Sequence, residues 1–125
     1  MSAQTQQNGL ARMTTALIAL SWYLQWGTGS GATSSANVVT TTSTTEARVS
    51  ATASQQTTTS TNDTLQLTGT ITAAGTRAIT EVGAFDAAGT GSPPTGGNMD
   101  LYGSFSVINL NSGDSIAFTI KVTYT

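Results

Sequence analysis

The 125-residue chain contains 40 Ser or Thr residues, no His, no Cys, and only four basic and six acidic side chains, for a net charge of −2. Acid–base and nucleophilic catalysis draw mainly on His, Cys, Lys and carboxylates, and Lys121 is the single lysine. We therefore expect a non-enzymatic protein without cofactor or metal site. Four basic residues that form no run also predict no binding to nucleic acid.

The apolar content is low for this length. Leu, Ile, Val and Phe make up 23 residues, and Ala supplies 16 more positions that each bury little area. Because burial of apolar surface drives folding, a thin core favours a protein that covers further surface in an assembly. A modestly stable monomer remains the alternative. The length suits a single domain over residues 1–125.

The N-terminal third predicts a helix followed by a strand. After a polar segment at residues 1–8, apolar residues recur at spacings of three and four, as in an amphipathic helix. From residue 21 the pattern alternates instead. We expect a helix near 8–20 and a strand near 21–27, with one continuous helix to Trp26 as the alternative. The apolar stretch Met13–Leu24 is too short to span a bilayer, so no membrane partner is expected. The apolar stripe consists of Leu10, Met13, Leu17, Leu20 and Leu24.

Residues 28–45 form a stretch rich in Thr, Ser and Gly, in which only Val38 and Val39 are sizeable and apolar. Long segments without a periodic pattern are uncommon in compact domains and are usually functional or disordered. We expect an extended arm that lies on another surface. Strand-like pairing of the threonines within the domain is the alternative.

Aromatic residues are few, and three of them cluster at Trp22, Tyr23 and Trp26. If they point inward they belong to the core, which we favour. If some point outward they are natural anchors of an interface, where aromatic side chains contribute much of the binding energy. The candidate interface residues are Trp22, Tyr23, Trp26, Val38, Val39 and Arg48.

The rest of the chain alternates with a period of two, which is typical of β-strands. Segments 46–53, 64–72, 99–107 and 115–124 each have one apolar side, whereas 78–86 is apolar on both sides and predicts a central strand. In segment 99–107 the expected inward row runs from Met99 to Val107. Turns are expected at Asn62-Asp63 and at 111–114, and a surface loop at 87–98. This pattern predicts a mainly β fold, an antiparallel β-sandwich or jelly roll with a short N-terminal helix and an extended arm.

Motifs that suggest chemistry are weak in this chain. The glycines of residues 27–31 lack the spacing of a phosphate-binding loop, and the six acids form no series like a calcium loop. Thr68, Thr70 and Thr72 align on one strand face, as an ice-binding surface would require. Such a surface should repeat on successive strands, and only segment 64–72 shows the row clearly. An adhesin is a further alternative.

Four segments of the chain form a recognisable set: Trp26–Gly29, Thr45–Val49, Ile79–Asp86 and Gly113–Ile120. Together they resemble small β-rich structural proteins of tailed bacteriophage virions. In that family an N-terminal helix leads into a strand that ends in a Gly-Thr-Gly turn, a Thr-Glu-x-Gly-x-Phe-Asp strand follows, and a Ser-Gly-Asp turn precedes the closing strand.

The resemblance implies a structural role in a virion and no catalytic residues. A capsid decoration or cement protein would bind the major capsid protein on the outer shell, as a dimer or trimer of itself, after synthesis in the host cytoplasm. A tail or baseplate component is the alternative. The polar N-terminal segment and the 28–45 arm favour a clamp across capsomers, and hence the cement role.

Overall fold

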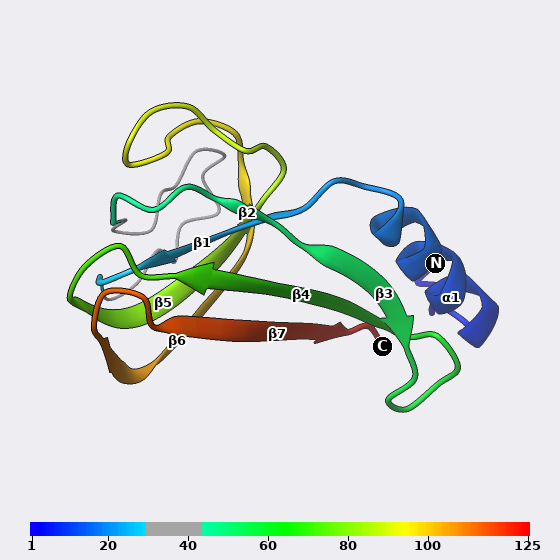
Figure 1. The fold of residues 1–125 in the computed structure, drawn as a ribbon. Helices are drawn as coiled ribbons and strands as arrows, with labels where there is room; N and C mark the ends of the chain where they lie inside the picture. Colours follow the sequence, from blue (N-terminus) through cyan, green and yellow to red (C-terminus); the bar gives the residue numbers. More distant parts are fainter. Residues whose placement is uncertain (30–43) are drawn as a thin grey trace.

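The computed structural model describes residues 1–29 and 44–125 and is mainly β. Two antiparallel sheets, with strand orders β2-β1-β5-β6 and β3-β4-β7, face each other as a β-sandwich (Figure 1). This confirms the predicted fold class. Most of the predicted arm, including Val38 and Val39, lies outside the described residues. The elements are α1 (Gln7–Ile18), β1 (Tyr23–Gly27), β2 (Val49–Ser50), β3 (Thr52–Gln56), β4 (Thr64–Thr72), β5 (Arg77–Phe85), β6 (Met99–Leu110) and β7 (Ser115–Thr123).

The helix ends at Ile18 and β1 begins at Tyr23. The predicted order of helix and strand is therefore confirmed, and a continuous helix to Trp26 is wrong. The predicted apolar stripe is wrong in part. Met13 is 41% exposed, and Leu20, which lies beyond the helix end, is 58% exposed.

A threonine takes one of the buried positions on α1. Thr14 is fully buried, and its hydroxyl donates to the carbonyl oxygen of Asn62 at 2.6 Å. The Gln55 amide of β3 in turn donates to the Thr14 hydroxyl at 2.8 Å. Because these hydrogen bonds satisfy the buried hydroxyl, a polar residue holds α1 against sheet β3-β4-β7. Hydrophobic periodicity does not reveal such a position.

Segment 46–53 does not form one strand. β2 pairs with β1 in one sheet, and β3, which starts two residues after β2 ends, pairs with β4 in the other. The chain therefore crosses between the sheets at Ala51. Its alternation breaks at Arg48, a charged candidate interface residue that is only 7% exposed.

β5 is the central strand that the sequence predicted, since it pairs with both β1 and β6. The expected inward row of β6 is wrong at both ends, because the β5–β6 register shifts between Ile79 and Glu81 and again near Phe85. Met99 lies beside Gly83 and Phe85 on the outer face of the sheet. Val107 is 52% exposed.

The expected turns form. Asn62 adopts a left-handed backbone with φ of 57°, and Asp63 follows it. The backbone N–H groups of Ser60, Thr58 and Thr59 donate to the Asp63 carboxylate and hold its pKa well below the ordinary range. Asp63 therefore closes the β3–β4 connection as an ionised acceptor.

The core lies between the two sheets. It is built around β1, β4 and β5, and Trp26 packs edge-to-face against Phe118 of β7. The buried cluster consists of Trp22, Leu24, Trp26, Leu65, Leu67, Ile71, Ala73, Ile79, Val82, Ala84, Leu110 and Phe118.

Candidate interaction surfaces

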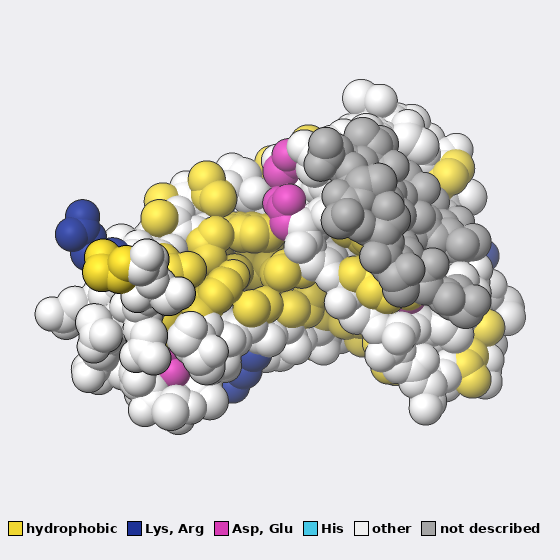
Figure 2. All heavy atoms as spheres, turned by 180° about the vertical axis from the view of Figure 1, so that it is seen from behind, with side chains coloured by type: hydrophobic (Ala, Val, Ile, Leu, Met, Phe, Trp, Pro, Cys, Tyr) yellow, Lys and Arg dark blue, Asp and Glu magenta, His cyan; other side chains and the backbone are white. Residues whose placement is uncertain are grey.

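On one side of the sandwich, apolar side chains of the described residues stay partly exposed. Seen from behind the view of Figure 1, hydrophobic side chains gather in a band that begins near α1 and crosses the middle of the molecule (Figure 2). Several apolar side chains contact the core yet remain partly exposed, and they come from the end of α1, from β6, from β7 and from the residue that follows β7. They include Leu17, Ile18, Leu101, Phe105, Ile116, Ile120 and Tyr124.

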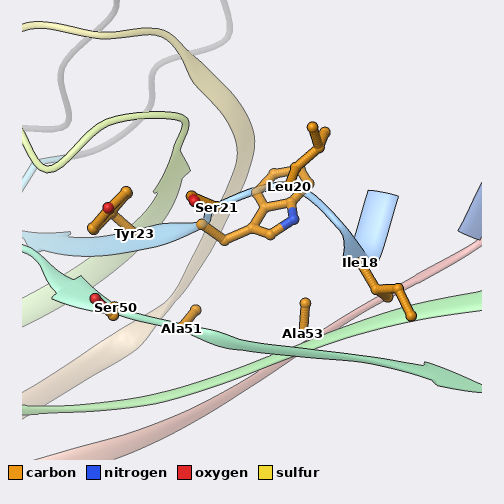
Figure 3. Close-up of a pocket in the computed structure, with 8 residues that line it drawn as sticks. Ile18, Leu20, Ser21, Tyr23, Ser50, Ala51 and Ala53 are labelled. Atoms are coloured by element: carbon orange, nitrogen blue, oxygen red, sulfur yellow. The ribbon is translucent and has the colours of Figure 1, made fainter. Parts of the chain in front are cut away.

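A small hollow of about 230 Å³ opens where α1 leads into β1 beside the β2–β3 crossing. Figure 3 shows Ile18 and Leu20 on one side and the strand residues Ser50, Ala51 and Ala53 on the other. The lining combines apolar side chains with the hydroxyl-bearing residues Ser21, Tyr23 and Ser50, carries no charge, and exposes more polar than apolar surface.

The aromatic cluster divides between core and surface. Trp22 and Trp26 are 5% and 1% exposed, so the inward interpretation holds for both indoles. Their N–H groups are paired, that of Trp22 with the carbonyl oxygen of Leu17 at 2.9 Å. Tyr23 is half-buried and lies opposite Ser50 of β2. Of the three aromatic candidates, only Tyr23 retains substantial surface for a partner.

Arg48 holds the loop at residues 86–98 against sheet β2-β1-β5-β6. Its Nε donates to Gln25 Oε1 at 2.7 Å, and its Nη1 donates to the carbonyl oxygens of Ala87 and Gly96 at 2.8 and 2.9 Å. The guanidinium also stacks over the Phe85 ring, 3.7 Å from its centroid. Burial lowers the pKa of Arg48, and the nearby Asp86 partly opposes this.

This environment changes the expected role of Arg48. A side chain that bridges two backbone carbonyls of one loop from beneath cannot also reach across a surface to a partner. Arg48 is thus a positioning residue, and any contribution to an interface must come through the loop that it orders. The repeated Gly residues of the 87–98 segment signal a loop, but nothing in the local sequence predicts the distant arginine that anchors it.

A second polar cluster closes the end of the sandwich. Glu46 Oε1 accepts from Arg77 Nε at 3.0 Å and from the N–H of Ala74 at 2.9 Å, while Oε2 accepts from the Trp26 indole at 3.3 Å and from the Thr44 hydroxyl. Burial opposes ionisation of this carboxyl group, but these donors outweigh it and lower the pKa to about 2. Glu46 therefore links the core indole to the loop before β5.

The Glu46 cluster predicts a measurable loss of stability in acid. Because the folded pKa is below the ordinary value of 4.5, the stabilisation is complete above about pH 4.5 and is lost as the pH falls towards 2. The Arg77 side chain is 22% exposed, so solvent screens its interaction with Glu46. We therefore expect ionised Glu46 to contribute ~1–2 kcal/mol to the free energy of unfolding at neutral pH, rather than the ~3 kcal/mol that corresponds to the full pKa shift. Urea unfolding of wild type and Glu46→Gln should differ by this amount at pH 7 and converge near pH 2. An undiminished difference at pH 2 would contradict the assignment.

The outer face of sheet β3-β4-β7 is polar, and its hydroxyl groups extend over more strands than the sequence indicated. The register places Thr52 and Thr119 on either side of Thr68. Lys121 of β7, paired with Gln66, interrupts this array with a charge and an amide. The face is therefore not a regular hydroxyl lattice. Sheet β3-β4-β7 lies in front in Figure 1, whereas the hydrophobic band is seen from behind in Figure 2.

Among residues 1–29 and 44–125, no group of three or more acidic, His or Cys side chains is placed to hold a metal ion. Asp86 and Asp100 lie near each other, and desolvation together with Asp86 raises the pKa of Asp100. In the same part of the chain, no helix has the length and apolar character needed to cross a membrane.

Comparison with protein-family models, curated proteins and solved structures finds no match for this chain.

Proposed function

We propose that this protein is a non-enzymatic structural component of a tailed bacteriophage virion, a decoration or cement protein that binds the outer capsid shell. The elements that carry the resemblance support this proposal. The Gly-Thr-Gly segment follows directly from β1, the Thr-Glu-x-Gly-x-Phe-Asp segment runs along the central strand β5, and the Ser-Gly-Asp turn precedes β7. The order of helix, strands and turns is the one that the resemblance implies.

The observation that carries the proposal is the incomplete cover of the core. Apolar side chains of α1, β6 and β7 contact the core but stay partly exposed, while the outer face of sheet β3-β4-β7 is polar. Apolar patches of this kind mark contact surfaces on soluble proteins. A protein with one apolar side and one hydrated side is suited to lie on a larger surface and face solvent with the other side.

The mechanism is mass action. A protein that binds the assembled shell but not its dissociated subunits stabilises the shell by its binding free energy. Many copies on one particle add their contributions, and a copy that contacts several capsomers gains from multivalency. Cement proteins therefore need neither a catalytic residue nor a tight single interface.

A tail or baseplate role remains the second candidate, because the same apolar surface would serve a ring of copies in a tail. The two roles differ in where the protein lies on the particle. Negative-stain microscopy of particles with the labelled protein separates them, since cement covers the shell and a tail component is confined to the tail.

Binding to particles that lack the protein tests the proposal directly. We expect the wild type to co-sediment with such shells and to raise the temperature at which they release their contents. Deletion of residues 1–6, which are exposed and precede α1, or replacement of the 28–45 segment by a shorter linker, should abolish attachment while the far-ultraviolet circular dichroism spectrum is retained. Full occupancy by both shortened proteins would refute the clamp, and failure of the wild type to bind would refute the cement role.

A further inference from the structure

The irregular pairing of β5 with β6 lines a pocket at the surface of the sandwich. The register shifts between Ile79 and Glu81, where Thr80 alone lies opposite residues 105–107. Bulges of this kind bend a strand, change the direction of its side chains and are frequent next to functional sites. The pocket has a volume of about 370 Å³, which is within the size range of small-molecule sites.

Hydroxyl groups and one aromatic ring line this pocket, and none of its lining residues is charged. Thr28 and Ser104 are exposed, so their hydroxyl groups are accessible to a ligand. The Thr80 hydroxyl donates to the carbonyl oxygen of Gly29 at 2.5 Å, and its oxygen can still accept a hydrogen bond. The lining residues are Thr28, Gly29, Thr80, Ser104 and Phe105.

Phe105 supplies a fixed apolar platform. Its ring packs against Phe118, with the ring centroids 6.1 Å apart, and Phe118 packs in turn against Trp26. Because Phe105 is only half-buried, part of the side chain lines the pocket as well as contacting the core. A ring that the core already holds in place loses little conformational freedom when a ligand packs on it.

We infer that this pocket binds a neutral sugar ring, such as the terminal hexose of a glycan. A pyranose has C–H groups on its faces, which pack on an aromatic ring, and hydroxyl groups around its rim, which donate and accept hydrogen bonds. The pocket offers both complements, in Phe105 and in the hydroxyl groups of Thr28, Thr80 and Ser104. The uncharged lining disfavours a phosphate or carboxylate, because such a group would lose hydration without gaining an opposite charge.

A single pocket of this kind binds weakly. For one neutral ring we expect a dissociation constant on the order of 1 mM, since a ligand with few atoms and no charge gains little binding free energy. The inference goes beyond the virion role, and the pocket does not depend on that role. On a particle that carries many copies, multivalency would convert the weak contact into retention on a surface rich in glycans.

NMR titration of the isotope-labelled protein with glucose, galactose, mannose and N-acetylglucosamine tests the inference. We expect at least one sugar to shift the amide signals of residues 28–29, 80 and 104–105 and to reach saturation. Cyclohexanol has a ring of similar size but a single hydroxyl group, and should bind roughly tenfold or more weakly, because a site built on hydrogen bonds rejects an analogue that lacks them. Absence of a saturable shift with all four sugars, or equally tight binding of cyclohexanol, would overturn the inference.

Two variants separate the ring from the hydroxyl groups. Phe105→Leu keeps an apolar contact with Phe118 and removes the flat ring, and should weaken sugar binding roughly tenfold. Thr28→Val keeps the shape of an exposed side chain and removes its hydroxyl group, and should weaken binding roughly three- to tenfold. Thr119→Val is the matched control, because it makes the same change at an exposed threonine of β7 outside the pocket.

The dispersion of the amide spectrum shows whether each variant is folded, and Thr28→Val keeps the test decisive if Phe105→Leu does not fold. Wild-type affinity in a folded pocket variant, or an equal loss in Thr119→Val, would overturn the assignment. Sugar binding is measured on the isolated protein and attachment to shells on particles. Failure of the sugar site and failure of the cement role therefore give distinguishable results.

Discussion

Arg48→Met should lower the free energy of unfolding by about 2–4 kcal/mol, the range expected when several buried acceptors lose their donors. The substitution leaves Gln25 Oε1 and the carbonyl oxygens of Ala87 and Gly96 without these hydrogen bonds. Replacing a buried ion pair by apolar residues is often neutral, but here the partners are a neutral amide and two carbonyls that stay behind unsatisfied. Urea denaturation monitored by tryptophan fluorescence measures the change.

The loop at residues 86–98 provides a second readout for the same variant. Without its anchor the loop should become susceptible to proteolysis while the sheets remain folded. Arg48→Lys is the matched control, because a lysine retains the charge but has no planar fork to reach three acceptors. We expect an intermediate loss of stability for Arg48→Lys. If the free energy of unfolding of Arg48→Met lies within about 0.5 kcal/mol of the wild-type value, Arg48 does not anchor the loop.

Leu67→Ala should destabilise the protein far more than Val122→Ala. Leu67 of β4 is fully buried, whereas Val122 belongs to the partly exposed row of β7. Removing a buried leucine side chain leaves a cavity and typically lowers stability by about 2–5 kcal/mol. For Val122→Ala we expect a loss of stability below ~1 kcal/mol, because part of the side chain already contacts water.

The comparison measures how far the core extends towards β7. Both residues lie in the same sheet, but Leu67 is in the central strand β4 and Val122 is in the edge strand β7, so the difference reports burial together with position in the sheet. Thermal unfolding followed by circular dichroism is sufficient. Equal effects of the two substitutions would show that β7 is as well buried as β4, and would remove the main support for the contact surface.

The sequence predicted the parts of the fold that depend on local periodicity. β4 and β7 alternate cleanly, β5 is apolar on both faces, and the turn at Asn62-Asp63 uses residues that favour it. Prediction from the sequence failed where the burial of a residue depends on a partner that is distant in the chain. Thr14 is buried because Asn62 and Gln55 satisfy its hydroxyl, and no local pattern on α1 indicates this.

Shifts in strand register account for the other failures. The expected inward row of β6 assumed uninterrupted pairing with β5, but the shift between Ile79 and Glu81 brings Val107 to the surface. Likewise, the alternation of segment 46–53 predicts one strand, although the segment contributes residues to strands of both sheets. The surface around Val107 could therefore not be found from alternation alone, since it arises from the failure of that alternation.

The crossing at Ala51 has a consequence for how the molecule comes apart. Val49–Ser50 and Thr52–Gln56 tie the two sheets together within eight consecutive residues. Peeling either sheet away must therefore pull on the other through this short tether. A pulling force on the domain would be shared by both layers, and the domain should yield as one mechanical unit.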